Sequence, residues 1–448
     1  MSTWGEAQRS DVARAVAAAC LSGDWEGAGM TARTTAMLGR RPRWLTSVVG
    51  ELLATYRDRP SDRSREVAAT IERMLHELEA AGRLPRPPRQ VPAGLFTPAM
   101  GRMRWAVPAI ETPADLAALL DLHPGELDWL GDRRGLQRRT AEQRLQNYRY
   151  RWLPRAGSPP RLIEQPKRLL KETQRRLLRQ ILEPIPPHDA AHGFRRGHSA
   201  LTHARRHTGR DVVLRFDLED FFASIAGGRV YGMFRTAGYP EAVAVALTGL
   251  VTNVLPAAEW ARAPGRGDPT AIAAHHRLGR RLATPHLPQG GPTSPALANL
   301  CAYRLDCRLA GLADATGAVY SRYADDIALS GGRRLHASAA RVRRAVEAIA
   351  RDEGFRVNPS KSQLMPRAGR QRICGIVVNE HPNTTRTDYD RLRALLHDAA
   401  LHGPAAANRA AVPDLRAHIL GRISWMEALN PRRGARQPRV FARIDWSG

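Results

Sequence analysis

Apolar and polar residues alternate along Val212–Asp217, and this pattern predicts a β-strand with one apolar face. Arg215 and Asp217 share the other face, which we expect to be an open side of a sheet. A second strand-like run leads to Tyr323, and Ile327–Gly332 reads as the return strand of a hairpin with the turn that closes it. The pattern therefore predicts a sheet with acidic residues at the ends of its strands.

Apolar residues recur at helical spacing near both ends of the chain. In the N-terminal region they occupy Val67–Leu75, followed by Leu78 and Ala81, and a Pro-rich link follows at Leu84–Arg89. Near the C-terminus the apolar stripes are Tyr389, Leu392, Leu396 and Ala399, then Leu415, Ile419, Ile423 and Met426. We interpret these stripes as helix cores rather than as sites.

Three carboxylates stand out as candidate chemistry. Asp325 and Asp326 are adjacent, and both can serve one metal cluster only where a strand reverses direction, because neighbouring side chains of a strand point to opposite faces. An isolated Asp-Asp pair is ordinarily a turn or a cap. Asp217 ends an apolar strand, and such an acid is usually solvated, paired or bound to a metal. Together they indicate metal-assisted phosphoryl chemistry.

A rigid turn lies between the two acidic segments. Leu287–Pro295 reads Leu-Pro-Gln-Gly-Gly-Pro-Thr-Ser-Pro and runs into a predicted helix. The apolar positions of that helix are Leu297, Cys301, Leu305 and Leu309. Considered by itself, this segment is no more than the start of a well-capped helix.

Taken in order, these segments resemble the reverse transcriptase family. Asp217–Phe222 is similar to the first palm motif of that family, Leu287–Pro295 to its Pro-Gln-Gly motif, and Tyr323–Asp326 to its Tyr-x-Asp-Asp motif. The resemblance covers roughly residues 115–445 and is greatest to the bacterial retron-type enzymes, a group that includes defence-associated reverse transcriptases. It implies RNA-directed DNA polymerase activity, that is, nucleotidyl transfer.

The same resemblance implies an α+β fold of the right-hand polymerase type. We expect a helical N-terminal extension in residues 1–110, fingers and palm in residues 111–385, and a helical thumb in residues 386–448.

The resemblance also assigns roles to the acids. Asp217, Asp325 and Asp326 would be the catalytic and metal-binding residues, with Asp217 and Asp325 bridging two Mg²⁺ ions and Asp326 a supporting ligand or an electrostatic partner. Mg²⁺ prefers hard oxygen donors, so carboxylates suffice without histidine or cysteine. Mn²⁺ is a candidate substitute.

Further residues match positions that contact substrate in the family. Phe222 would block a ribose 2′-hydroxyl and so select dNTPs; the alternative is an ordinary core aromatic. Tyr323 would touch the primer end. Lys361 matches a lysine assigned as proton donor to pyrophosphate, with phosphate contact or a surface charge as alternatives. The complete set of expected nucleotide-binding residues is Arg155, Arg161, Phe222, Gln289, Gly290 and Lys361.

Composition agrees with a polyanionic partner. The formal net charge is +26 over 448 residues, with a pI near 11.2. Only Lys167, Lys171 and Lys361 among the 69 basic residues are lysines, an arginine bias that a GC-rich genome also produces. The resemblance to reverse transcriptases implies more specific partners: an RNA template in the form of a dedicated noncoding RNA, the DNA product or RNA–DNA hybrid, dNTPs, and an effector or toxin protein.

Four scattered cysteines form neither a zinc motif nor a disulfide scaffold, which favours a reduced, cytoplasmic chain. The N-terminus has no apolar core of signal-peptide type, and the longest apolar stretch, residues 242–255, is too short to cross a bilayer. No membrane partner is expected.

Two markers of retron enzymes are altered. The Asn-Ala-x-x-His marker appears as His203–His207, with His203 in place of Asn, and the Val-Thr-Gly marker appears as Ile373-Cys374-Gly375. A true retron enzyme and a related defence-associated lineage therefore both stay open. Two other functions also stay open: an RNA-dependent RNA polymerase, which Phe222 disfavours, and a catalytically idle RNA-binding scaffold, which the intact carboxylates disfavour.

Overall fold

The computed structural model describes residues 4–85, 98–140, 142–155, 159–264 and 269–446. The chain divides into two compact units. The first comprises residues 1–185 and 226–294, and the second comprises residues 186–225 and 295–448.

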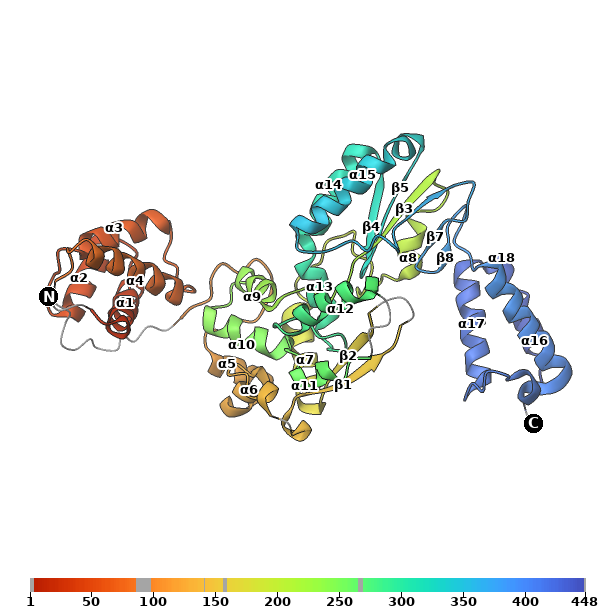
Figure 1. Ribbon diagram of the computed structural model, residues 1–448, viewed down its shortest axis with the longest axis horizontal. Helices are drawn as coiled ribbons and strands as arrows, with labels where there is room; N and C mark the ends of the chain where they lie inside the picture. Colours follow the sequence, from red (N-terminus) through yellow and green to blue (C-terminus); the bar gives the residue numbers. More distant parts are fainter. Residues whose placement is uncertain (1–3, 86–97, 141, 156–158, 265–268, 447–448) are drawn as a thin grey trace. The chain divides into compact units, whose positions relative to one another are not determined.

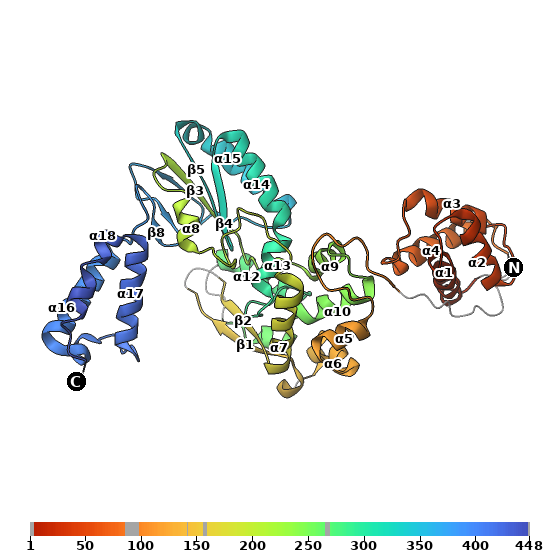
Figure 2. The same cartoon turned by 180° about the vertical axis from the view of Figure 1, so that it is seen from behind.

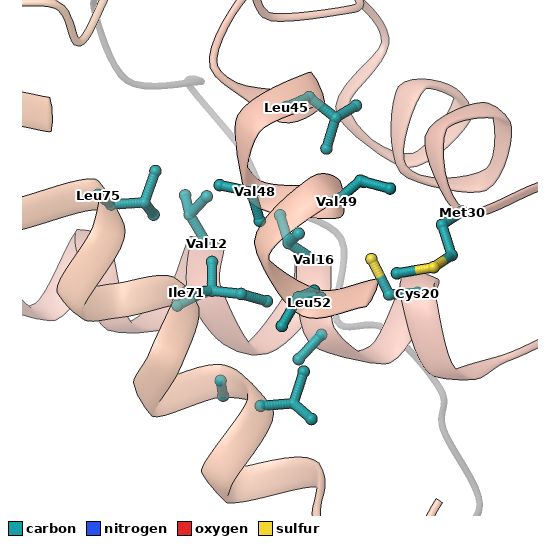
Figure 3. Close-up of a cluster of buried hydrophobic side chains, with 14 of the residues drawn as sticks. Val12, Val16, Cys20, Met30, Leu45, Val48, Val49, Leu52, Ile71 and Leu75 are labelled. Atoms are coloured by element: carbon teal, nitrogen blue, oxygen red, sulfur yellow. The ribbon is translucent and has the colours of Figure 1, made fainter. Parts of the chain in front are cut away.

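The first unit begins with a helical bundle. Its helices are α1 (Glu6–Leu21), α2 (Gly27–Leu38), α3 (Leu45–Thr55) and α4 (Ser64–Ala80). Their apolar faces meet in one core, in which Val16, Leu52 and Ile71 are fully buried (Figure 3). Arg9 of α1 pairs with Glu79 of α4 at 2.6 Å. The helical N-terminal region expected from the sequence is confirmed; part of the Pro-rich link lies outside the described residues.

The rest of the first unit contains a two-stranded hairpin and several helices. Strand β1 (Tyr148–Leu153) pairs antiparallel with β2 (Arg161–Pro166). The tip of this hairpin, residues 156–158, lies outside the described residues. The helices are α5 (Pro113–Leu120), α6 (Pro124–Gly131), η1 (Gln137–Arg139), η2 (Gln143–Leu145), α7 (Arg168–Leu177), η3 (Leu178–Leu182), α9 (Gly227–Thr236), α10 (Glu241–Val251), α11 (Ala257–Ala261) and α12 (Pro269–Leu282).

A four-stranded antiparallel sheet forms the centre of the second unit (Figure 1). Its strands, in spatial order, are β4 (Val319–Tyr323), β5 (Asp326–Gly331), β3 (Val212–Asp217) and β6 (Gln363–Pro366). The remaining elements around it are α8 (Ala200–Arg205), α13 (Ser294–Cys301), α14 (Tyr303–Thr316), α15 (Arg333–Asp352), β7 (Arg372–Ile373) and β8 (Ile376–Val377). The predicted strand at Val212–Asp217 and the predicted acidic hairpin are both present.

Helices cover both faces of this sheet (Figure 2). On the face of Leu214 and Phe216 lie α14 and α15. The opposite face, which the alternation predicted to be open, is covered around Val213 by a core that includes Ala204 of α8 and Ile373 of β7. The prediction was wrong there because a helix and a hairpin distant in sequence pack onto that face. The cover ends near Arg215, whose side chain is 22% exposed.

The helix predicted after the Pro-Gln-Gly turn is divided into α13 and α14 at Ala302, and its four predicted apolar positions are buried. Residues 386–446 form α16 (Arg386–Ala407), α17 (Leu415–Leu429), α18 (Pro431–Gly434) and α19 (Gln437–Phe441). The two C-terminal apolar stripes pack into one core here, with Tyr389 at its margin. Among the described helices, none combines the length and apolarity needed to cross a membrane.

Candidate active site

The acidic hairpin has a two-residue turn. Tyr323 pairs with Asp326, which leaves Ala324 and Asp325 as the turn residues. Ala324 has a φ of 55°, a left-handed conformation that tight hairpins require and that non-glycine residues seldom adopt. A hydrogen bond holds the turn, since the Leu218 N–H donates to Asp325 O at 2.9 Å. The backbone of Gly193 also lies close to the turn, because a Cβ added at Gly193 would be 2.6 Å from Ala324 N. Glycine at 193 therefore allows the backbone to approach the turn.

The pairing of β3 with β5 gathers the three carboxylates at one end of the sheet. Asp217 lies directly opposite Asp326, and Asp325 precedes Asp326 in the turn. Asp217 is 7% exposed and Asp326 is 6% exposed. Residues separated by about a hundred positions in the sequence thus form one acidic cluster.

Two of the three carboxylates have basic partners. Arg215 donates from Nε to both oxygens of Asp326, at 2.8 and 2.9 Å, and its Nη2 lies 2.8 Å from Oδ2. Lys361 Nζ lies 3.1 Å from Asp217 Oδ2. Within the described chain, Asp325 has no ion-pair partner. The positive charges therefore neutralise the flanks of the cluster and leave Asp325 without direct compensation.

Burial raises the pKa of Asp325, and the nearby charge of Asp217 raises it further. Burial also raises the pKa of Asp326, an effect that Arg215 partly offsets. Repulsion between Asp217 and Asp325 is the kind of charge accumulation that a divalent cation relieves.

The donor set fits a magnesium ion that shares its ligands with substrate. No group of three or more His, Cys, Asp or Glu side chains in the described residues is placed to hold a metal by itself. Mg²⁺ is commonly bound by one or two carboxylates, together with water and substrate phosphates. Asp217 and Asp325 match that requirement, whereas the Asp326 oxygens are engaged by Arg215.

Aromatic side chains border the cluster. The Phe222 ring lies 6.0 Å from the Phe194 ring, which in turn lies 6.3 Å from the Tyr323 ring. Phe194 is 47% exposed and has a φ of 58°. It links the residue expected to select the sugar with the residue expected to touch the primer. Phe194 stands in the segment Ala191-His192-Gly193-Phe194, and the sequence analysis did not single it out as a candidate site residue.

The other expected nucleotide contacts lie in the first unit. Gln289 O accepts the Glu164 N–H of β2 at 2.9 Å. Gly290 has a φ of 137°, and a Cβ there would lie 2.7 Å from Glu164 O. Arg161 starts β2 and Arg155 is exposed before the undescribed tip. The Pro-Gln-Gly turn and the basic hairpin are therefore packed together, while the acids, Phe222, Tyr323 and Lys361 belong to the second unit.

A buried ion pair supports the hairpin from the α14 side. Arg322 and Asp306 are both fully buried, with Nη2 2.6 Å from Oδ2. Tyr320 Oη donates to Asp306 Oδ1 at 2.6 Å, and Arg322 Nη1 donates to Ala324 O at 3.0 Å. The pair thus connects the α14 helix to the turn that carries Asp325. Alternation places Arg322 on the apolar face, a conflict that could have indicated a buried partner.

A histidine–serine network supports the hairpin from the α8 side. Ser321 Oγ lies 2.7 Å from His203 Nδ1 and 2.8 Å from His207 Nε2. His207 Nδ1 lies 2.7 Å from Ser330 Oγ. Burial lowers the pKa of His203 to about 3 and that of His207 below its usual range, so both are neutral. The first altered retron marker therefore bonds to both strands of the hairpin.

The second altered marker packs beside the first. Cys374 lies against the core that contains Ala204 and Ile373, and its Sγ lies 3.5 Å from Asp326 Oδ2. Burial raises the pKa of the Cys374 thiol, so it acts as a donor. Both markers thus meet behind the acidic hairpin.

A family model described as reverse transcriptase (RNA-dependent DNA polymerase) matches residues 154–384 and so includes all three acids. The chain belongs to the reverse transcriptase family. The match confirms the expected right-hand polymerase fold class and the expected activity: the enzyme is an RNA-directed DNA polymerase.

Relatives of this reverse transcriptase include retron enzymes. The retron Mx65 reverse transcriptase of Myxococcus xanthus is 37% identical over 336 residues, which cover 75% of this chain and 72% of that protein. The retron Mx162 enzyme of the same organism is 32% identical, with coverages of 72% and 65%. The retron Ec86 enzyme of Escherichia coli is 32% identical over 238 residues, with coverages of 53% and 64%. This enzyme is thus of retron type.

Among solved structures, telomerase from Candida albicans in complex with a telomeric RNA fragment matches with a TM-score of 0.36 and 9% identity. The match covers 65% of this chain and 54% of the telomerase chain.

Proposed function

We propose that this reverse transcriptase copies a dedicated noncoding RNA into DNA by two-metal nucleotidyl transfer, and that it acts in anti-phage defence with an effector or toxin protein. The observation that carries the catalytic part is the register that sets Asp217 opposite Asp326, with Asp325 in the adjoining turn. Similarity to retron enzymes supports the noncoding RNA and the defence role.

In this proposal Asp217 and Asp325 hold Mg²⁺, with Mn²⁺ as a substitute. Bound ions would activate the primer hydroxyl and stabilise the leaving pyrophosphate. Asp326 has a different role: its bonds to Arg215 and Cys374 fix the start of β5, and so fix where the neighbouring Asp325 carboxylate lies. Asp326 therefore acts as an electrostatic and positioning partner.

Substrate contacts are proposed for each unit by itself, beginning with the second unit. Phe222 excludes a 2′-hydroxyl, and Tyr323 contacts the primer end. Lys361, 3.1 Å from Asp217, is within reach of a phosphate bound at the cluster and neutralises it or donates a proton to pyrophosphate. The arginines suit bidentate phosphate contact. The proposed contacts of the first unit are Arg155 and Arg161 to the triphosphate and Gln289 and Gly290 to the template and nucleotide.

The catalytic part is tested with purified protein, Mg²⁺ and a primed RNA template. We expect DNA synthesis with dNTPs, little incorporation of NTPs, and loss of at least a thousandfold in Asp325→Asn. Phe222→Ala should raise NTP incorporation while dNTP incorporation stays measurable. Equal synthesis by Asp325→Asn and wild type would refute the assignment of Asp325. Preferred use of NTPs would favour an RNA polymerase instead.

The biological part is tested in cells that carry the gene with its neighbouring DNA. Sequencing of the nucleic acid that co-purifies with the protein should yield one abundant RNA and DNA complementary to it. Phage plaque counts should rise when Asp217→Ala replaces wild type. Protection that survives Asp217→Ala would instead indicate an RNA-binding scaffold.

A further inference from the structure

The charged residues of helix α15 differ in whether they form an ion pair. Arg343 pairs with Glu347 on the same helix at 3.0 Å. Arg308 of α14 pairs with Asp352 and Glu353 at the C-terminal end of α15, at 2.8 and 3.0 Å. In contrast, five exposed arginines of α15 form no ion pair within the described chain, namely Arg333, Arg334, Arg341, Arg344 and Arg351. Three of the five share one surface: Arg334, Arg341 and Arg344.

These three arginines line one groove. The groove has a volume of about 550 Å³ and lies between α15 and the C-terminal end of α14, which run side by side (Figure 1). Thr316 and Ser338 complete its polar lining, and their hydroxyls donate to helix carbonyls at 2.8 and 2.9 Å. The other lining residues are alanines, and the described lining includes no acidic and no aromatic side chain. The groove therefore offers positive charge without an internal counter-ion.

The spacing of the arginines indicates the size of the ligand. Arg334 and Arg344 are ten residues apart on one helix, which is roughly 15 Å along the axis. A single phosphate ion is too small to engage all of these charges at once. A phosphodiester backbone can engage them, because it repeats its charge every few ångströms.

The lining also indicates which form of nucleic acid fits. Proteins that bind single strands combine basic residues with aromatic rings on which unpaired bases stack. Double-helical RNA is recognised mostly through its backbone and shape. A groove with arginines and hydroxyls but no described aromatic residue matches the second case.

We propose that the α14–α15 groove is a binding site for the phosphodiester backbone of double-helical RNA. The buried residues of α15, such as Val342 and Val346, face the sheet, so the arginines lie on the outer surface of the helix, away from the carboxylate cluster. The site would hold a folded part of the RNA while another part is copied. This inference rests on the use of an RNA template and is independent of the metal ligands.

The test compares two double variants of α15 that lose the same charge. Arg341→Gln with Arg344→Gln alters the groove, and Arg333→Gln with Arg351→Gln alters exposed, unpaired arginines outside it. Affinity for a short RNA hairpin is measured by fluorescence anisotropy at several salt concentrations. We expect the groove variant to lose about tenfold or more in affinity and its salt slope to fall by about 2, one for each lost phosphate contact. The control should stay within about twofold.

Two readouts separate this inference from the proposed catalytic function. DNA synthesis on a short primed template and the thermal unfolding midpoint should be unchanged in the groove variant, so that a folding defect or a catalytic defect is recognised. Equal losses in the groove and control variants would refute the site, since general charge would then explain binding. A loss confined to single-stranded RNA or to duplex DNA, or displacement of the hairpin by millimolar inorganic phosphate, would also refute it.

Discussion

Two arginine–aspartate pairs lie on opposite faces of the sheet, and their burial differs. Arg322 and Asp306 are fully buried beneath α14. Arg215 and Asp326 lie at the end of the other face, with side chains 22% and 9% exposed. The first pair is enclosed by protein, and removal of one partner leaves a charge that water cannot reach. The second pair belongs to the carboxylate cluster that we propose as the catalytic site.

This difference separates a structural from a functional use of the same interaction. A fully buried pair is costly to break because the remaining charge is uncompensated. The second pair is only partly enclosed: Arg215 is 22% exposed, so water can still reach its guanidinium when Asp326 is replaced. We therefore expect the larger effect on catalysis rather than on stability. The acidic hairpin is thus held rigidly by the first pair and tuned electrostatically by the second.

The largest effect is expected at the enclosed pair. Asp306→Ala should lower the free energy of unfolding by about 3–5 kcal/mol, because Arg322 is left buried and unpaired. Urea denaturation measures this loss. Arg322→Met combined with Asp306→Leu should recover much of it, because both charges are then absent. A change below about 1 kcal/mol in Asp306→Ala would contradict the structural assignment of this pair.

At the open pair, Asp326→Asn should lower kcat by about a hundredfold, a magnitude typical for the loss of one preorganised electrostatic contact. The free energy of unfolding should change by less than about 1 kcal/mol. Single-turnover DNA synthesis tests the expected loss of catalytic rate, and urea denaturation tests the expected small change in the free energy of unfolding. If Asp326→Asn strongly destabilised the protein and left kcat unchanged, the Arg215–Asp326 pair would be structural rather than functional.

A smaller, pH-dependent effect is expected from His203, which also supports the hairpin. Burial lowers the pKa of His203 in the folded protein to about 3, whereas a histidine in the unfolded chain has a pKa of about 6.5. As the pH falls below about 6.5, the unfolded chain therefore binds a proton that the folded protein does not. The free energy of unfolding decreases over this range, down to the folded pKa. His203→Asn should reduce the loss between about pH 6.5 and 5 by about 1–2 kcal/mol. Urea denaturation across that range tests this. An unchanged slope would mean that His203 is protonated in the folded enzyme.

The smallest effect is expected at Cys374. Its thiol is a weak donor to Asp326, so Cys374→Ala should lower kcat by roughly two- to fivefold, within the range of one hydrogen bond, and Cys374→Ser should retain activity. Steady-state kinetics on a primed RNA template compares the variants. Equal kcat in all three proteins would remove Cys374 from the group that positions Asp326.

The parts of the site that the sequence predicted depend on local patterns. The strand that ends in Asp217, the hairpin at Asp325 and the helix after the Pro-Gln-Gly turn each follow from spacing within a few residues. The supporting contacts depend instead on pairing between distant segments. Ser321 contacts His203 because α8 packs against the sheet at the place where the register of β4 puts Ser321. No local sequence pattern contains that information.

Phe194 and the covered sheet face escaped prediction for related reasons. Phe194 has a left-handed backbone conformation, which its residue type does not favour, so its sequence does not reveal where the ring lies. The sheet face around Val213 was predicted to be open because the alternation of apolar and polar residues describes a single strand. It does not show which distant segments pack on that strand. Tertiary packing decided both outcomes.

The spatial order of the central sheet also has a consequence for synthesis on the ribosome. Strand β3 pairs with β5 and β6, which follow it by about a hundred residues or more. At about 5–20 residues per second, β3 waits roughly 5–20 s for its first partner. The α1–α4 bundle needs no such delay, because its core is complete once α4 has emerged. Nascent chains should therefore display an early folded segment followed by a period in which an apolar strand depends on chaperone protection.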